Sequence, residues 1–209
     1  MAHIRKPLAA ATALNTAIFL GEAIAGYKSQ SLSLLMDSVH NLSDELALIC
    51  LMLAYLLPIT LSRHLQRSAN LFNSMGLVAI SGVLVWQSVE RLLHPTPVLA
   101  LFPVVIGLLA AAGNWGVALF LQGVKDQNPA IHLAYLHNLG DIYVSLAPVA
   151  AGVLVALSGS SFFDPLMALC IASWIIWTTV QEVASSREGL LWPEDAICGH
   201  GPNEAAERF

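Results

Sequence analysis

The chain has 209 residues, of which 56% are hydrophobic and only 11% are charged, and its mean hydropathy is +0.68. An ordinary soluble domain carries about 25% charged residues, so too little polar surface remains here to cover a water-soluble globule. The formal net charge is −5 and no basic patch is present, which argues against a nucleic-acid partner. The composition therefore predicts an all-α integral membrane protein built as one domain.

Six apolar segments are each long enough to span a bilayer as a helix of about 20 residues. In chain order they are Pro7–Tyr27, Leu34–Leu57, Leu71–Val89, Val98–Leu121, Ile131–Leu157 and Pro165–Val183. Short polar connections separate them, and the segment from Arg63 to Arg67 is an expected loop. The sequence thus predicts a bundle of six transmembrane helices.

Two further features concern the ends of these segments. Asp164-Pro165 is typical of a helix start, with an N-cap acceptor followed by proline at the first helical position. Residues 1–190 are expected to form the transmembrane domain. Residues 191–209 are expected to be a short cytoplasmic tail that is disordered, because it is too short for a core of its own.

The basic residues predict the orientation of the bundle. With a cytoplasmic N-terminus, seven basic residues lie inside and two lie outside, which predicts that both termini are cytoplasmic. The inside residues are Arg5, Lys6, Arg63, Arg67, Lys125, Arg187 and Arg208, and the outside residues are Lys28 and Arg91. An alternative interpretation treats the first segment as a signal peptide cleaved near Ala23-Ile24-Ala25, which would leave five spans.

The second segment carries an unusual number of ionisable side chains for a membrane helix. A carboxylate near the bilayer centre costs about 2.5–3.5 kcal/mol on insertion scales, so such residues are usually functional. At about 100° per residue, Asp37, His40 and Asp44 fall on one stripe about 60° wide. Glu45 lies off this stripe. The spacing therefore predicts one polar face.

The fifth segment repeats the pattern, because His137 and Asp141 are again four residues apart. Two imidazoles and two carboxylates form a four-ligand set suited to tetrahedral zinc. A divalent cation would also neutralise both carboxylates. The alternative interpretation is that each His and Asp form only a buried hydrogen-bonded pair. Two copies on separate membrane helices favour the metal site.

Other polar residues have weaker interpretations. Glu22, in the first segment, is either a carboxylate of the transport pathway or an interfacial residue. Asp37 is expected to line the entry path or to support the metal ligands. Ser145 continues the face that carries Asp141 and is a further candidate for such a role. Asn15 and Asn114 are expected to hydrogen-bond between helices.

Four segments resemble the cation diffusion facilitator family: "SQSLSLLMDSVHNLSD", "SVERLLHPTPV", "NPAIHLAYLHNLGD" and "DPLMALCIASWII". The resemblance implies proton-coupled efflux of zinc or a similar ion from the cytoplasm, usually by a homodimer, in the inner membrane of a bacterium. It implies no permanently bound cofactor. The family's transport site falls on His40, Asp44, His137 and Asp141. Histidine at position 40 suggests a preference for zinc, while Cd²⁺, Co²⁺, Fe²⁺ and Mn²⁺ stay open.

The chain also departs from the family pattern. Family members usually carry a soluble metal-binding domain after the sixth helix, and this sequence ends about two dozen residues after it. A short form would dimerise through membrane helices, and Gly76 and Gly82 make the third segment our candidate. The alternative functions are a membrane metal sensor or scaffold subunit without transport and, less favoured, a metalloenzyme. An enzyme is not expected, because four ligands close the metal site and no HExxH motif is present.

Overall fold

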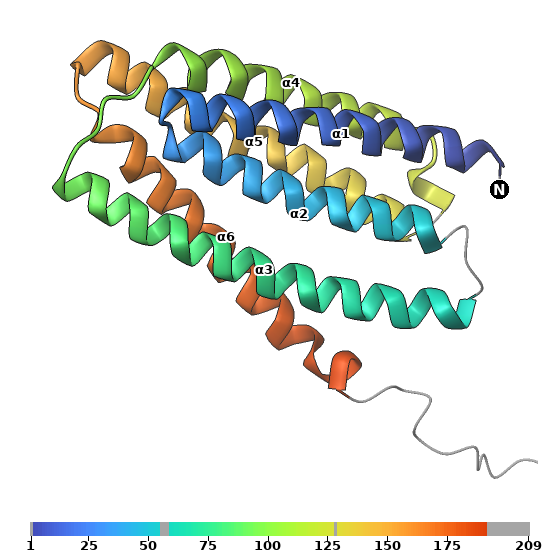
Figure 1. The fold of residues 1–209 in the computed structure, drawn as a ribbon. Coiled ribbons are helices and arrows are strands. Elements are labelled where there is room, and N and C mark those ends of the chain that lie inside the picture. The colour runs from blue at the N-terminus through green and yellow to red at the C-terminus, as the bar shows by residue number, and fades with distance from the viewer. Residues whose placement is uncertain (1, 55–58, 128, 192–209) are drawn as a thin grey trace, which may run out of the picture.

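The computed structural model describes residues 2–54, 59–127 and 129–191, and all regular structure in these ranges is helical. The elements are α1 (Ala2–Ser29), α2 (Leu32–Ala54), α3 (Ile59–Leu93), α4 (Leu101–Gln122), the short 3-10 turn η1 (Lys125–Gln127), α5 (Pro129–Ser158) and α6 (Phe163–Leu191). Figure 1 shows the long helices side by side in an elongated bundle. The predicted all-α class is confirmed.

Five of the described helices, α1, α3, α4, α5 and α6, are long and apolar enough to cross a membrane. The exception is α2, because Asp37, Asp44 and Glu45 all lie within its 23 residues and lower its hydropathy. With several such helices, the chain is a multi-pass integral membrane protein. With three acidic residues in its first fourteen, α2 is the helix that most needs shielding from lipid.

The bundle consists of two groups of helices that meet at α2 and at α5. Helices α1, α2, α4 and α5 pack together, with the closest associations between α4 and α5, α1 and α2, and α1 and α4. Helix α3 packs against α6 and α2. In Figure 1, α3 and α6 lie along one side of the other four helices. Because α2 contacts both groups, its polar face is surrounded by protein.

Two apolar clusters fill the interior on either side of the polar residues. The first joins α1, α2 and α4 with the start of α5 and includes Ile4, Leu8, Leu48, Leu121 and Ile131. The second joins α2, α3 and α6 and includes Leu32, Met36, Leu84, Ile171 and Ile175. Burial of these side chains supplies the packing that holds α2 and α5 in place.

A glycine lets α4 and α5 approach closely. A Cβ atom at Gly107 would lie 3.0 Å from the carbonyl oxygen of Ser145 and 2.8 Å from Cγ2 of Val149. Both distances are shorter than a comfortable carbon contact, so only glycine fits without a shift. This approach places Asn114 of α4 within hydrogen-bonding distance of Ser145, at 3.1 Å from Nδ2 to Oγ.

The start of α2 is fixed by a carboxylate from another helix. The backbone N–H of Leu32 donates to Oδ2 of Asp164 at 2.6 Å, and the hydroxyls of Ser31 and Ser33 each donate to Oδ1 at 2.6 Å. The prediction that Asp164 caps its own helix was therefore wrong. Because α6 begins at Phe163, the Asp164 side chain is free to cap the buried end of α2.

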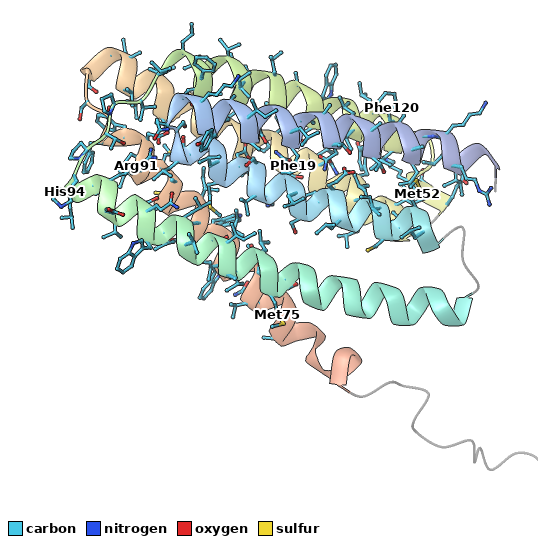
Figure 2. All side chains as sticks on the ribbon, in the orientation of Figure 1. Phe19, Met52, Met75, Arg91, His94 and Phe120 are labelled. Carbon is cyan, nitrogen blue, oxygen red and sulfur yellow. The ribbon has the colours of Figure 1, made fainter. Side chains whose placement is uncertain are left out.

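The far end of α3 is tied to the turn between α1 and α2. Arg91 donates from Nη2 to Oε1 of Gln30 at 3.2 Å, and from Nη1 to the Gln30 carbonyl. Figure 2 labels Arg91 and His94 near this end of α3. Gln30 itself has a φ of 59°, which allows the chain to reverse between the two helices.

The prediction of a loop from Arg63 to Arg67 was wrong, because these residues lie inside α3. The segment contains neither proline nor glycine, so nothing in its local sequence stops the helix. Helix α1 likewise begins at Ala2, before the expected start at Pro7. The end of the second predicted segment at Leu57 and most of the predicted tail, 192–209, lie outside the described residues.

Candidate metal site

The candidate ligands come from two helices, each of which presents a histidine and an aspartate one turn apart. His40 and Asp44 lie on α2, and His137 and Asp141 lie on α5. Residues four apart on an α-helix stack on the same face. Each helix therefore offers one imidazole nitrogen and one carboxylate as neighbours.

The structure brings these four side chains together. One potential ligand atom from each lies within 4.8 Å of the other three. His40 Nε2 is 2.9 Å from Asp141 Oδ1, and His137 Nε2 is 2.7 Å from Asp44 Oδ1. Within each helix the corresponding Nε2–Oδ2 distances are 3.8 Å. Each imidazole is thus hydrogen-bonded to the carboxylate of the opposite helix.

The cluster is enclosed on most sides and reachable on one. The side chains of His40, Asp44 and Asp141 are 12%, 7% and 4% exposed, whereas that of His137 is 49% exposed. The two imidazole rings meet edge to face, with centroids 5.6 Å apart. An ion would therefore reach the carboxylates past His137.

The donor set fits a divalent cation. Asp44 Oδ2, Asp141 Oδ2 and His40 Nδ1 are buried and have no hydrogen-bond partner. In a tetrahedral zinc site with bonds of about 2.0–2.2 Å, neighbouring ligand atoms lie about 3.3 Å apart. The four Nε2–Oδ pairs given above are 2.7–3.8 Å apart. Small side-chain movements would suffice for the four atoms to surround one ion.

Glu45 lies off the ligand stripe, as the helical spacing predicted, but it is buried against α1. Thr16 Oγ1 donates to Glu45 Oε1 at 2.6 Å, and Asn15 Nδ2 donates to Oε2 at 3.3 Å. Asn15 also donates to the backbone carbonyl of Asn41 at 3.0 Å. The expected interhelical role of Asn15 is confirmed. The role of Glu45 was missed, although the polar residues of the otherwise apolar α1 were a signal for it.

The three weaker candidates lie outside the four-residue cluster, in the interior between helices. Glu22 is 1% exposed and its Oε2 accepts a hydrogen bond from Asn41 Nδ2 at 2.6 Å. Asp37 is fully buried and neither of its carboxylate oxygens has a hydrogen-bond partner. Ser145 Oγ accepts the bond from Asn114 described above. Glu22 is therefore enclosed between helices, and its role stays a prediction.

His132 does not join the cluster. It is exposed, and its ring lies 6.4 Å from that of Tyr135, which in turn lies under the Lys125 ammonium group at 4.4 Å. Among the cysteines, Cys50 is half-buried and Cys170 is exposed.

Comparison with known proteins gives a consistent picture. The family described as "Cation efflux transmembrane domain" matches residues 8–62 and 63–191. Zinc transporter ZitB of Escherichia coli (strain K12) is 31% identical over 169 residues, covering 75% of this chain and 53% of the relative.

Two further relatives carry names that mention protons. The "Cadmium, cobalt and zinc/H(+)-K(+) antiporter" of Bacillus subtilis (strain 168) is 28% identical over 171 residues, which cover 77% of this chain and 55% of the relative. The "Proton-coupled zinc antiporter SLC30A2" of Mus musculus is 24% identical over 203 residues, 84% of this chain and 54% of the relative. The chain spans about half the length of the curated relatives it matches.

Proposed function

The chain belongs to the cation efflux family, and we propose that it exports zinc in exchange for protons across a bacterial inner membrane. One observation carries this proposal: four ligand atoms of the type zinc prefers, two imidazole nitrogens and two carboxylate oxygens, lie together between α2 and α5. The family relationship, and the names of the relatives described above, support the same activity.

In the proposed mechanism, zinc and protons compete for His40, Asp44, His137 and Asp141. Zinc binds neutral imidazole and ionised carboxylate, so its binding displaces protons from the site. Without the ion, the imidazole–carboxylate hydrogen bonds hold the four side chains together. Alternating access then exposes the same residues to each side of the membrane in turn, and protons entering from outside displace the metal.

We extend the proposal to the topology of the chain. All six helices span the bilayer, with α2 shielded by its neighbours, and both termini are cytoplasmic, as the distribution of basic residues favours. The polar residues Asn15, Thr16 and Glu22 of α1 bond to α2, so α1 belongs to the working bundle and not to a cleaved signal peptide.

Residues 1–190 act as one transporter domain, and the transporter works as a homodimer through its membrane helices. Helix α3 supports this because Gly76 and Gly82 have open space where a Cβ would stand, and Met75, Val83 and Trp86 are exposed. Small residues next to large apolar ones allow close helix contacts within a membrane. Zinc is the preferred cargo, and Cd²⁺, Co²⁺, Fe²⁺ and Mn²⁺ are the competitors to compare.

The test is metal uptake into sealed vesicles that contain the purified full chain and hold an imposed pH gradient. The proposal predicts zinc flux that depends on the gradient and collapses when a protonophore dissipates it. A membrane sensor or scaffold subunit would bind zinc in the same preparation without moving it. Binding without gradient-dependent flux would therefore overturn the proposal of transport.

A further inference from the structure

A second acidic pair lies in the interior, separate from the four ligand residues. Glu22 of α1 is 1% exposed and Asp37 of α2 is fully buried. The two carboxyl groups lie beside each other. Among the described residues, the group able to hold a metal contains neither of them. The proposed metal site therefore leaves these two acids without an assigned role.

Most oxygens of this pair have no hydrogen-bond donor. Glu22 Oε2 accepts the bond from Asn41, but Glu22 Oε1 and both oxygens of Asp37 have no partner. Ser145 lies beside Asp37, and because its oxygen accepts from Asn114, its hydroxyl is a nearby donor for that carboxylate. A buried ionised carboxylate without donors is costly, and two such groups side by side also repel each other.

The other charged groups near the pair do not remove this cost. Asp44 is the further acid near Glu22, while His40 and Asp141 are the titratable groups that lie near Asp37 beyond Glu22 itself. In the described part of the chain, neither Glu22 nor Asp37 forms an ion pair with a lysine or arginine. His40 is the nearby side chain that can carry a positive charge, and the lack of a lysine or arginine partner leaves a shared proton as the simplest way to neutralise the pair.

We propose that Glu22 and Asp37 share one proton, which they release when zinc binds at the neighbouring metal site. Two adjacent buried carboxyl groups commonly retain a single proton between them, as in aspartic proteases. A proton suits the pair better than a second zinc ion, because within the described ranges no imidazole or thiolate groups with the two carboxylates to complete a coordination shell. The inference rests on the proposed function.

The connection to the metal site runs along α2. Asp37 precedes His40 by three residues on the same stripe, and Asn41, which is hydrogen-bonded to Glu22, directly follows His40. A divalent charge at the metal site favours the ionised form of a nearby acid. On zinc binding, the carboxyl O–H bond breaks, its electron pair stays on oxygen, and the proton passes to water. By reciprocity, protonation of the pair weakens zinc binding.

The experiment counts protons released per zinc ion. Full-chain protein in lipid nanodiscs is titrated with zinc at fixed pH in buffers of different ionisation enthalpy, so that calorimetry yields both the affinity and the proton count. Glu22→Gln and Asp37→Asn should each release about one proton fewer per zinc than the wild type. Glu90→Gln, which changes an exposed acid on α3, is the matched control and should leave the count unchanged.

Infrared difference spectra detect the protonation of carboxyl groups directly. If the Glu22–Asp37 pair had only a structural role, zinc binding would not change its carboxyl bands. The wild type should lose a protonated-carboxyl band on zinc binding, Glu22→Gln and Asp37→Asn should lack this change, and Glu22→Asp should restore it. An unchanged proton count in both amide variants would overturn the inference, as would a wild type without this zinc-sensitive band. A second bound zinc in the wild type that disappears in Glu22→Gln would instead identify a metal site.

These outcomes are distinct from failure of the proposed function. If the wild type binds no zinc at all, the metal site itself is wrong. If the wild type binds zinc and releases protons, but the variants release the same number, only the role of the Glu22–Asp37 pair is wrong. Thermal unfolding of every variant checks that the fold survives, and the wild-type infrared band decides the question if an amide variant does not fold.

Discussion

Asp44→Asn tests the carboxylate contribution to zinc binding most sharply. The substitution keeps the side-chain shape, and the amide oxygen can still accept the 2.7 Å hydrogen bond from His137. What it removes is one of the two negative charges that face the ion, at a position that is only 7% exposed and has little water to compensate. Removal of one partner from a buried charge pair costs about 3–5 kcal/mol.

At about 1.4 kcal/mol per factor of ten, this cost corresponds to zinc binding weakened at least about 100-fold and up to several thousand-fold. The assay is competition for zinc between the nanodisc-embedded protein and a chromogenic chelator, with Glu90→Gln as control. Wild type and control should bind equally well. If Asp44→Asn weakens binding less than about tenfold while the protein stays folded, Asp44 is not a ligand and the reasoning fails.

Three further predictions concern selectivity and the supporting contacts. His40→Asp keeps a ligand but replaces nitrogen with oxygen, so vesicle flux should shift toward metals that accept oxygen ligands more readily; an unchanged order of preference would show that His40 does not set selectivity. Glu45→Gln turns an amide group toward Asn15 or Thr16, leaving one buried bond unmade, and should lower the free energy of unfolding by about 1–3 kcal/mol with zinc affinity nearly unchanged. Asp164→Ala deletes the cap of α2 and should destabilise the fold by at least about 1–2 kcal/mol. Chemical denaturation measures both losses, and wild-type stability in either variant would contradict the contact concerned.

The sequence predicted the pairing within each helix because the i, i+4 spacing depends only on helical geometry. His40 and Asp44 had to share a face, and so did His137 and Asp141. That the two faces meet is a tertiary fact, produced by the packing of α2 and α5 within the bundle. The family resemblance anticipated it, whereas helical periodicity alone did not. That these four residues bind zinc stays a prediction.

The errors arose where a side chain acts on a distant helix or a local signal was too weak. The Asp164-Pro165 pattern was interpreted locally, but the carboxylate caps α2, which lies about 130 residues earlier in the chain. Glu45 was judged only by its angle to the ligand stripe, and the angle does not reveal that Thr16 and Asn15 stand opposite it. The polar run from Arg63 to Arg67 was taken for a loop although it contains no helix breaker.

The most direct test of the central claim is X-ray absorption spectroscopy at the zinc edge on the full chain in lipid with one equivalent of zinc. The account predicts four nitrogen and oxygen ligands at about 2.0–2.2 Å, two of them imidazoles, with no sulfur. His137→Ala should remove one imidazole from the signal. A coordination shell with sulfur, or a spectrum identical in the wild type and His137→Ala, would contradict a zinc site built from His40, Asp44, His137 and Asp141.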